Sequence, residues 1–469
     1  MSLRFVRFPL ALLLISGLGC SDGDNPVDSG GLDGGADSGA ADTGASDAGD
    51  PDSGALDSGS SDTGVMDTGV MDSEVTDADP PLDGGDATAG DAMVDDAAMD
   101  AGDATAGDAT MDAGDSTTDA GPPWAACSGG TGDVLLHTGY QAGLPRVAWT
   151  GTEYAFAHFE RTGATSSDPT ESYFGFADAT GGTTTGPDAV TPLDGEVSIW
   201  VRFARSDVGY GVTYLDDRGA VRAAYFARLD AAGALIAGSE LQISTGTARG
   251  IAITYNPVDR HYGVAWQVTG SDIELQRITA EGALVTPATT VGGGGVAYTG
   301  TPLIWTGDRY AIVHGSSLVV SEVQGDGTLV RTEALGVTGT RPALAYAGGQ
   351  YGVVWQNGGE VHFLRVDASG PVSGSDRILD AGPNSGEADI VGAGTEFGVT
   401  WQKGSAGVPN DVWFSRVSAA GAVTGPAQLT TTSARDWWPS ITWCGQYAIV
   451  YHRGPGSLGS LDEIRLVFP

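Results

Sequence analysis

The chain has 469 residues, of which 60 are acidic and 22 are basic, for a formal net charge of −38 at pH 7. This charge is uneven, because residues 21–122 contain 27 Asp or Glu and no Lys or Arg. A field of this sign repels phosphate backbones, so nucleic acid is excluded as an expected partner. After the N-terminus no apolar run reaches the roughly 18 residues that a membrane-spanning helix requires.

Residues 1–20 have the layout of an export signal. Arg4 and Arg7 precede an apolar run at 8–18, which is too short to span a bilayer stably. The run leads to Cys20, and this ending resembles the signal of bacterial lipoproteins, whose cysteine is lipid-modified and becomes the first residue. The resemblance implies lipidation of Cys20 and, with a serine following it, a place in the outer membrane or at the cell surface. A secreted or periplasmic protein without an anchor is the alternative.

The acidic region, residues 21–123, is expected to be a disordered linker. It consists mainly of Asp, Gly, Ala, Ser and Thr in short near-repeats such as GDATAGDATMDAGD at 102–115. Such a composition cannot bury enough apolar surface to offset its conformational entropy, and like charges extend it. The recurring aspartates leave calcium binding open, although no calcium loop of the EF-hand type is present.

Residues 124–469 contain an internal repeat. It is recognised by an aromatic residue that follows a turn and precedes an alternating apolar strand. The spacings between successive aromatic residues range from 41 to 56 residues. The seven positions are Tyr154, Tyr210, Tyr262, Tyr310, Tyr351, Phe397 and Tyr447.

Each copy is predicted to contain four short strands and no helix. Alternation of apolar and polar residues in PALAYA (342–347) and QYGVVWQ (350–356) has the period of strands, and a glycine-containing turn separates them. Four strands in a repeat of 40 to 50 residues are typical of a β-propeller blade. The sequence therefore predicts an all-β, seven-bladed propeller over 124–469.

The two ends of the repeat region are predicted to share one blade. The seventh copy ends after its third strand at 463–469, and residues 133–143 resemble the fourth strand that it lacks. Cys127 lies just before that N-terminal strand, and Cys444 lies in the first hairpin of the same blade. If Cys20 is acylated, these two cysteines are an even pair in an oxidising compartment, which favours a disulfide. Two separate thiols are the alternative.

No residue is assigned a catalytic, cofactor-binding or metal-binding role. The segment LIWTGDRYAIVHG (303–315) combines several residue types that are common in active sites. However, His314 occupies a repeat position that holds a large flat side chain in every copy. We expect that position to pack between blades. Cys and His show no metal-ligand spacing, and no nucleophile elbow, phosphate loop or zinc-protease motif is present.

Arginines recur at one register position in the third strand of four copies. We expect them to bond between blades. They are Arg228, Arg277, Arg365 and Arg416.

Loops that break the repeat are the predicted binding surface. The longest join strands two and three of blades six, seven and one, and the connection SARDWWPS (433–440) is expected on the same face. Exposed aromatic residues beside arginine are typical of binding surfaces. The candidates are Trp437, Trp438, Arg435, Arg453, Arg161, Lys403 and Tyr140.

As a whole, the chain resembles the stalked propeller lipoproteins of myxobacteria and related Gram-negative bacteria. The resemblance implies a monomeric cell-surface binding or scaffolding protein whose ligand is a protein or a glycan, with membrane contact only through the lipid. The alternative is a glycan-active hydrolase or lyase with carboxylates in the propeller channel, for which Glu196 and Asp389 are the candidates.

Overall fold

The computed structural model describes residues 127, 129–192, 195–219, 221–268, 272–295, 300–405, 408–455 and 459–469. The export signal, Cys20 and the acidic linker lie outside the described residues. All elements in the described part are β-strands, which confirms the predicted all-β class. No helix there is long and apolar enough to cross a bilayer.

Five antiparallel sheets are each built from strands that are consecutive in the sequence. The first contains β5 (Ser198–Ser206), β6 (Gly209–Asp216), β7 (Ala223–Leu229) and β8 (Leu241–Gln242). The second contains β9 (Ala248–Asn256), β10 (His261–Val268), β11 (Asp272–Thr279) and β12 (Leu284–Gly293). The third contains β13 (Leu303–Trp305), β14 (Arg309–His314), β15 (Ser317–Gln324) and β16 (Leu329–Thr338). The fourth contains β17 (Thr340–Ala347), β18 (Gln350–Asn357), β19 (Glu360–Asp367), β20 (Gly370–Pro371) and β21 (Arg377–Asp380). The fifth contains β22 (Ser385–Ala393), β23 (Glu396–Ser405), β24 (Val408–Ser418) and β25 (Val423–Gln428).

A sixth sheet joins the two ends of the repeat region. Its order is β26-β27-β28-β1-β2-β3-β4. The C-terminal strands are β26 (Asp436–Trp443), β27 (Tyr447–Arg453) and β28 (Leu461–Phe468), and the N-terminal strands are β1 (Gly132–Trp149), β2 (Tyr154–Arg161), β3 (Thr170–Ala177) and β4 (Thr183–Ala189). The first half of β1 pairs with β28 from Gly132 to Tyr140, and the second half pairs with β2 from Tyr140 to Trp149. The strand expected at 133–143 is therefore continuous with the first strand of the next repeat.

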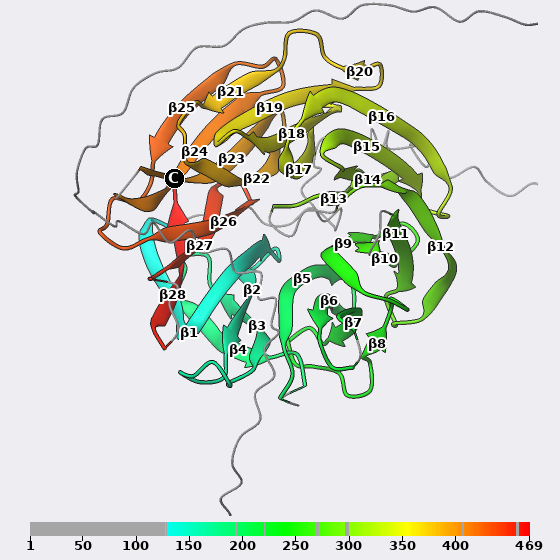
Figure 1. The fold of residues 1–469 in the computed structure, drawn as a ribbon, viewed down its shortest axis with the longest axis vertical. Coiled ribbons are helices and arrows are strands. Elements are labelled where there is room, and N and C mark those ends of the chain that lie inside the picture. Colours follow the sequence, from blue (N-terminus) through cyan, green and yellow to red (C-terminus); the bar gives the residue numbers. More distant parts are fainter. Residues whose placement is uncertain are drawn as a thin grey trace, which may run out of the picture. The chain divides into compact units, whose positions relative to one another are not determined.

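The core consists of apolar clusters between consecutive sheets. In Figure 1 the sheets follow one another in chain order around a common centre. One cluster joins Phe174 of β3 to Tyr210 of β6, and another joins Tyr310 of β14 to Leu275 of β11. The cluster that contains Val147, Tyr154 and Ile464 joins β1 and β2 to β28. Apolar clusters thus lie between sheets that follow one another in the chain, and one lies between the two halves of the sixth sheet.

The repeated aromatic residues form these clusters as expected from strand alternation. The first aromatic residue of each copy is buried, except for half-buried Tyr447. The residue four positions later is buried in every copy, and His314 is only 2% exposed. His314 Nδ1 lies 3.0 Å from the carbonyl oxygen of Gly293, and its Nε2 lies 2.9 Å from Ser321 Oγ. His314 is therefore a packed and hydrogen-bonded residue of the core.

Two of the expected fourth strands are only fragments, and a serine explains both. The backbone N–H of Arg228 donates to Ser239 Oγ at 3.0 Å, and that of Arg365 donates to Ser375 Oγ at 3.1 Å. A side-chain oxygen thus takes the place of a ladder carbonyl. As a result β8 contains two residues, and the fourth strand of the β17 sheet is divided into β20 and β21.

Three of the four repeated arginines bond to the next sheet, as predicted. The Nη1 atoms of Arg228 and Arg277 each donate at 3.0 Å to a backbone carbonyl, of Glu281 and Gly325 respectively. Arg365 Nη1 donates to the carbonyl of Ala419 at 2.5 Å. Arg416 differs, because it lies 3.7 Å from Glu396 of its own sheet.

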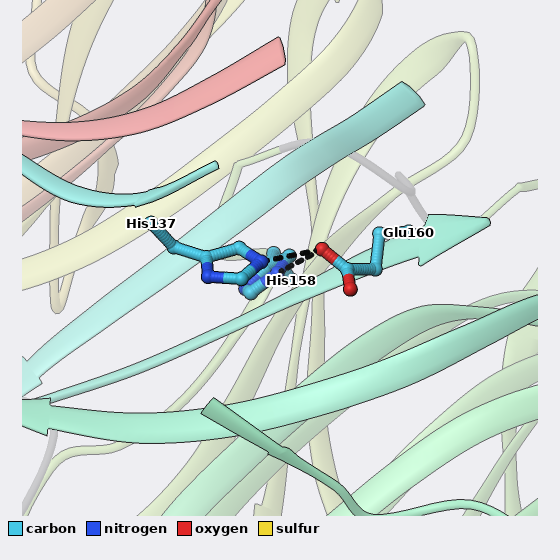
Figure 2. A group of neighbouring side chains, drawn as sticks. All are labelled: His137, His158 and Glu160. Carbon is cyan, nitrogen blue, oxygen red and sulfur yellow. Dashed lines mark hydrogen bonds and ion pairs between the residues drawn. The ribbon is translucent and has the colours of Figure 1, made fainter. Parts of the chain in front are cut away.

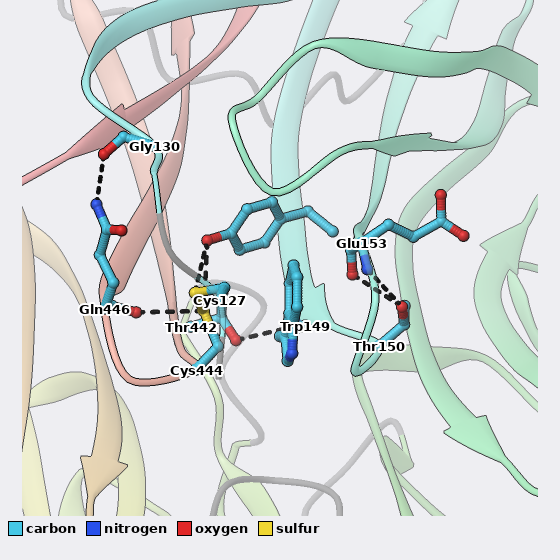
Figure 3. Close-up of a disulfide and its surroundings, with 9 residues drawn as sticks. Cys127, Gly130, Trp149, Thr150, Glu153, Thr442, Cys444 and Gln446 are labelled. Atoms are coloured by element: carbon cyan, nitrogen blue, oxygen red, sulfur yellow. Dashed lines mark hydrogen bonds between the residues drawn. A yellow bond between two sulfur atoms is a disulfide. The ribbon is translucent and has the colours of Figure 1, made fainter. Parts of the chain in front are cut away.

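Cys127 and Cys444 form a disulfide at the seam between β1 and β26–β28 (Figure 3). Their Cα atoms are 5.3 Å apart and their separation in sequence is 317 residues. Both cysteines are buried in the cluster between β1, β2 and β28. The hydroxyl of Tyr154 lies 3.2 Å from Cys127 Sγ and 3.3 Å from Cys444 Sγ.

Replacing both cysteines with serine should lower the free energy of unfolding by about 2–4 kcal/mol, because the bond restricts a very long loop of the unfolded chain. Urea denaturation followed by tryptophan fluorescence measures this difference. The wild-type chain under reducing conditions is the control, and its free energy of unfolding should be close to that of the variant. Equal stability of the oxidised chain and the variant would show that the disulfide does not hold the seam.

Candidate functional site

In or just before the first strand of each repeat, one residue at an equivalent position lies in the left-handed backbone region. The seven positions are Leu144, Trp200, Gly250, Gly300, Arg341, Glu387 and Trp438, with φ between +46° and +72°. In β1, β5, β9, β17, β22 and β26 the residue lies at a register shift of the ladder, which is a β-bulge. A left-handed conformation costs a non-glycine residue on the order of 1 kcal/mol or more. Bulges re-aim the side chains that follow them.

The residue two positions after each bulge occupies an equivalent place in every repeat. Each lies opposite the residue three positions after the repeated aromatic, as in the pairs Arg146 with Ala157 and Asp389 with Thr400. In the β13 repeat the same relation appears as a hydrogen bond from the N–H of Val313 to the carbonyl of Pro302. We call this set the channel ring: Arg146, Arg202, Ala252, Pro302, Ala343, Asp389 and Ser440.

Five members of the channel ring, all except Ala343 and Asp389, line a cavity between the first strands. The cavity has a volume of about 670 Å³, including the space open to solvent. Residues from β1, β5, β9, β22 and β26, and from the segment leading into β13, line it. The ring is polar on the side of Asp389, Ser440, Arg146 and Arg202 and apolar on the side of Ala252, Pro302 and Ala343.

The polar side of the ring holds two arginines and one carboxylate. Arg146 and Arg202 are 7% and 6% exposed, and Asp389 is fully buried. Arg146 Nη1 lies 3.6 Å from Asp389 Oδ2, which also accepts the N–H of Ile441 at 3.2 Å. Arg146 Nε and Asp389 Oδ1 have no hydrogen-bond partner among the described residues. The ring residues therefore bring two cations and one anion into a site with unused hydrogen-bonding atoms.

Burial acts strongly on both arginines. It lowers the pKa of Arg202 well below its usual value, and the nearby charge of Arg146 lowers it further, while Asp389 opposes the shift. Burial also lowers the pKa of Arg146, again against the attraction of Asp389. An anion entering the ring would stabilise the charged form of both side chains.

Glu196, the other carboxylate suggested for the channel, is exposed and precedes β5. It is not a member of the channel ring. Asp389 is the one acidic residue of the ring, so the ring does not hold the pair of carboxylates that glycoside hydrolysis commonly uses.

Trp437 and Trp438 lie within β26 and not in a connecting loop, which corrects the expected placement. Trp438 is the bulge residue of that strand, and its N–H donates to Gln402 Oε1 at 2.9 Å. Its ring stacks on buried His452 at 5.4 Å and contacts Trp437 at 5.5 Å. Both tryptophans are half-buried. The bulge thus holds Trp438 beside Ser440 of the channel ring.

The two arginines near these tryptophans differ in their surroundings. Arg435 is exposed, with its guanidinium 5.4 Å from the ring centre of Trp437. Arg453 forms two hydrogen bonds to fully buried Asp436, at 2.7 and 3.0 Å, and one to Asp133 at 3.0 Å. Arg453 is therefore an ion-pair residue of the structure, and its contact with a ligand stays a prediction.

The other three candidates lie in β1, β2 and β23. Lys403 lies in β23 and pairs with Asp380 at 2.8 and 2.9 Å. Arg161 donates to Gln141 Oε1 at 2.5 Å and to the carbonyl of Asp168 at 2.8 Å. Tyr140 is half-buried and lies opposite Arg161 in the ladder of β1 and β2.

A second polar group, which is absent from the predicted candidates, lies where β1 passes from β28 to β2. His137, His158 and Glu160 approach one another there (Figure 2). Burial lowers the pKa of His158. Burial alone would raise the pKa of Glu160, but hydrogen bonds with His137 and His158 outweigh it and lower the pKa to about 2. The one sequence signal is the His-x-Glu spacing of 158 and 160, which puts both side chains on one face of a strand.

Arg453→Ala should lower the free energy of unfolding by about 3–5 kcal/mol, because it leaves the buried carboxylate of Asp436 without its cation. Arg435→Ala is the matched control and should change stability by less than about 0.5 kcal/mol, since the side chain is exposed. Urea denaturation of both variants measures the difference. Similar stability of the two would contradict the structural role of Arg453.

No family model and no curated protein sequence matches the chain. Among solved structures, hydrazine synthase of Kuenenia stuttgartiensis is 15% identical with a TM-score of 0.39, and the alignment covers 54% of this chain and 75% of that one. The NanB sialidase of Streptococcus pneumoniae is 9% identical with a TM-score of 0.41, covering 74% and 70%. Trypanosoma rangeli sialidase is 7% identical with a TM-score of 0.37, covering 70% and 55%. Structural similarity at this level supports no conclusion about activity.

Proposed function

We propose that residues 124–469 are a seven-bladed β-propeller, closed by β1, that binds an anionic glycan at the mouth of its axial channel. The pairing of β1 with both β28 and β2 supports the closure. The equal register of the channel-ring residues in seven repeats supports the blade count. In this proposal Cys20 carries a lipid and the acidic region is a stalk that holds the propeller away from the membrane.

The observation that carries the binding proposal is the charge of the channel ring. Arg146 and Arg202 are both buried beside a single buried carboxylate, Asp389. Buried charges are costly, and a bound anion would stabilise them and accept a hydrogen bond from Nε of Arg146, which has no partner among the described residues. Guanidinium groups also bind carboxylates and sulfates with directional hydrogen bonds.

Two further features favour a sugar that carries the anion. Trp438 lies at the bulge next to the ring and Trp437 contacts it, so half-buried aromatic surface is available close to the cationic site. Aromatic faces combined with a few polar groups are typical of small-ligand sites. Since the chain as a whole is strongly acidic, a densely charged polyanion would be repelled. We therefore propose a glycan with isolated carboxylate or sulfate groups, such as one that contains a uronic acid.

A glycan array with matched neutral, uronate-containing and sulfated oligosaccharides tests the proposal on the full chain. We expect retention of anionic glycans and a loss of at least about tenfold in Arg202→Gln, since a directional charged contact is worth more than about 1.4 kcal/mol. This variant leaves Arg146 facing Asp389, and circular dichroism checks that its fold is unchanged. Arg205→Gln on the same strand is the control, because Arg205 does not line the cavity.

Three results of this experiment would overturn the proposal. Equal retention of neutral and anionic glycans would remove the role of the ring charge, and so would unchanged binding by Arg202→Gln. Release of shortened products from the captured glycans would replace binding by the alternative function, a glycan-active hydrolase or lyase.

Cys20→Ser should abolish incorporation of labelled palmitate and move the protein from the membrane fraction to the soluble fraction. The physical reason is that acyl chains anchor a protein in proportion to the CH₂ groups that they bury. Expression in a Gram-negative host, followed by fractionation, measures both effects. Retention of the serine variant in the membrane fraction would argue against a lipid anchor, and Cys127→Ser is the control for loss of a cysteine elsewhere.

A further inference from the structure

We propose that His137, His158 and Glu160 form a binding site for a divalent transition-metal ion of the zinc type. The site lies in the seam where β1 passes from the sheet edge of β28 to that of β2. It is distinct from the channel ring, and it does not depend on the proposed function.

The three side chains already converge on one point. His137 Nε2 lies 2.6 Å from Glu160 Oε2, and His158 Nε2 lies 3.3 Å from the same oxygen. The two imidazole ring centres are 4.9 Å apart, and the three donor atoms lie within 4.8 Å of one another. Figure 2 shows both rings directed toward the carboxylate. Small movements of the side chains would bring two nitrogens and one oxygen to the roughly 2.0–2.2 Å that zinc requires.

The backbone explains why the ligands meet. His137 belongs to the half of β1 that pairs with β28, opposite Ile464. His158 and Glu160 are two residues apart on β2, so they share one face of that strand. A metal ion held by the three residues would therefore connect the part of β1 paired with the C-terminal strand to β2.

Gly139 provides the space for the carboxylate. A Cβ at this position would overlap Glu160 Oε2 and come within 3.0 Å of His137 Nε2. Its φ lies outside the left-handed region, so the backbone itself does not require glycine at this position. Glycine at position 139 therefore leaves room for the carboxylate of Glu160.

The buried surroundings of the cluster contain further polar side chains. His158 is fully buried, and its Nδ1 has no hydrogen-bond partner among the described residues. A second pair lies in the same seam: His452 Nε2 is 3.4 Å from Asp462 Oδ2, and Asp462 is opposite Gly139 in the ladder. Buried imidazoles and carboxylates are costly unless they are bonded or bind a cation. A bound metal ion would offset this cost.

The donor set selects the class of metal. Two imidazoles and one carboxylate suit Zn²⁺ and neighbouring transition metals, whereas Ca²⁺ and Mg²⁺ prefer oxygen ligands. Three protein ligands also leave a fourth position for water in a tetrahedral site. The carboxylates of the acidic region offer only oxygen donors, so they should bind zinc more weakly and without a fixed stoichiometry.

Calorimetric titration of the chelator-treated full chain with ZnCl₂ tests the site. We expect one saturable site in the wild type. Zinc affinity should fall by about 100-fold or more in His137→Gln and Glu160→Gln, since loss of a residue that only hydrogen-bonds to a metal ligand already lowers affinity by about 10- to 100-fold. His261→Gln removes a histidine outside the cluster and should bind as the wild type does. Zinc should also raise the thermal midpoint of the wild type, because it binds the folded state.

Gly139→Ala provides an independent variant that keeps all three ligands. The added methyl group should displace the Glu160 carboxylate and weaken zinc binding at least tenfold, while circular dichroism shows an unchanged fold. Visible absorption of bound Co²⁺ reports whether nitrogen ligands are used, and this signal should be lost in His137→Gln. Equal zinc affinity in the wild type, His137→Gln and Glu160→Gln, or no saturable site at all, would show that the cluster is only a hydrogen-bonded group.

Discussion

The rest of the domain depends on the two ladders of β1, one with β28 and one with β2. Without them, the edges of β28 and β2 would present unpaired N–H and C=O groups to solvent, and such edges promote aggregation. The same strand places Leu136 and Val147 in the cluster that contains Tyr154 and Ile464, so backbone pairing and apolar burial act at one seam. The Cys127–Cys444 disulfide and the His137, His158 and Glu160 group lie along it as well.

The repeats share a backbone and differ in the side chains that the backbone directs toward the centre. A left-handed residue recurs in or just before every first strand, and glycine fills this position in two copies. The bulge therefore belongs to the architecture and not to one ligand site. What varies is the residue two positions later, which is arginine or aspartate at three positions and alanine or proline at three others. Function in such a fold is decided by a few of these inward positions, because the others only fill space.

Much of the fold could be predicted because repeat spacing and strand alternation are local signals. The buried series from His158 to Tyr451, including His314, follows from period-two alternation alone. The candidate site could be predicted much less well. Trp437 and Trp438 are predicted in a connecting loop but lie in β26, and the sequence does not reveal that Arg453 pairs with buried Asp436. Loop length and residue type do not reveal where a ladder begins or which carboxylate is buried behind a strand.

By itself, the sequence determined the strand content, the repeat and the uneven charge of this protein, since each depends on residues close together in the chain. The tertiary structure alone decided that Arg146 and Arg202 line one cavity and that Arg146 meets Asp389, although Arg146 and Asp389 are far apart in sequence. It also decided that His137 meets His158 and Glu160. Both groupings arise from bulges and register shifts in β1 and its counterparts. A shift of one residue in a strand exchanges its two faces, and no local pattern reports that shift.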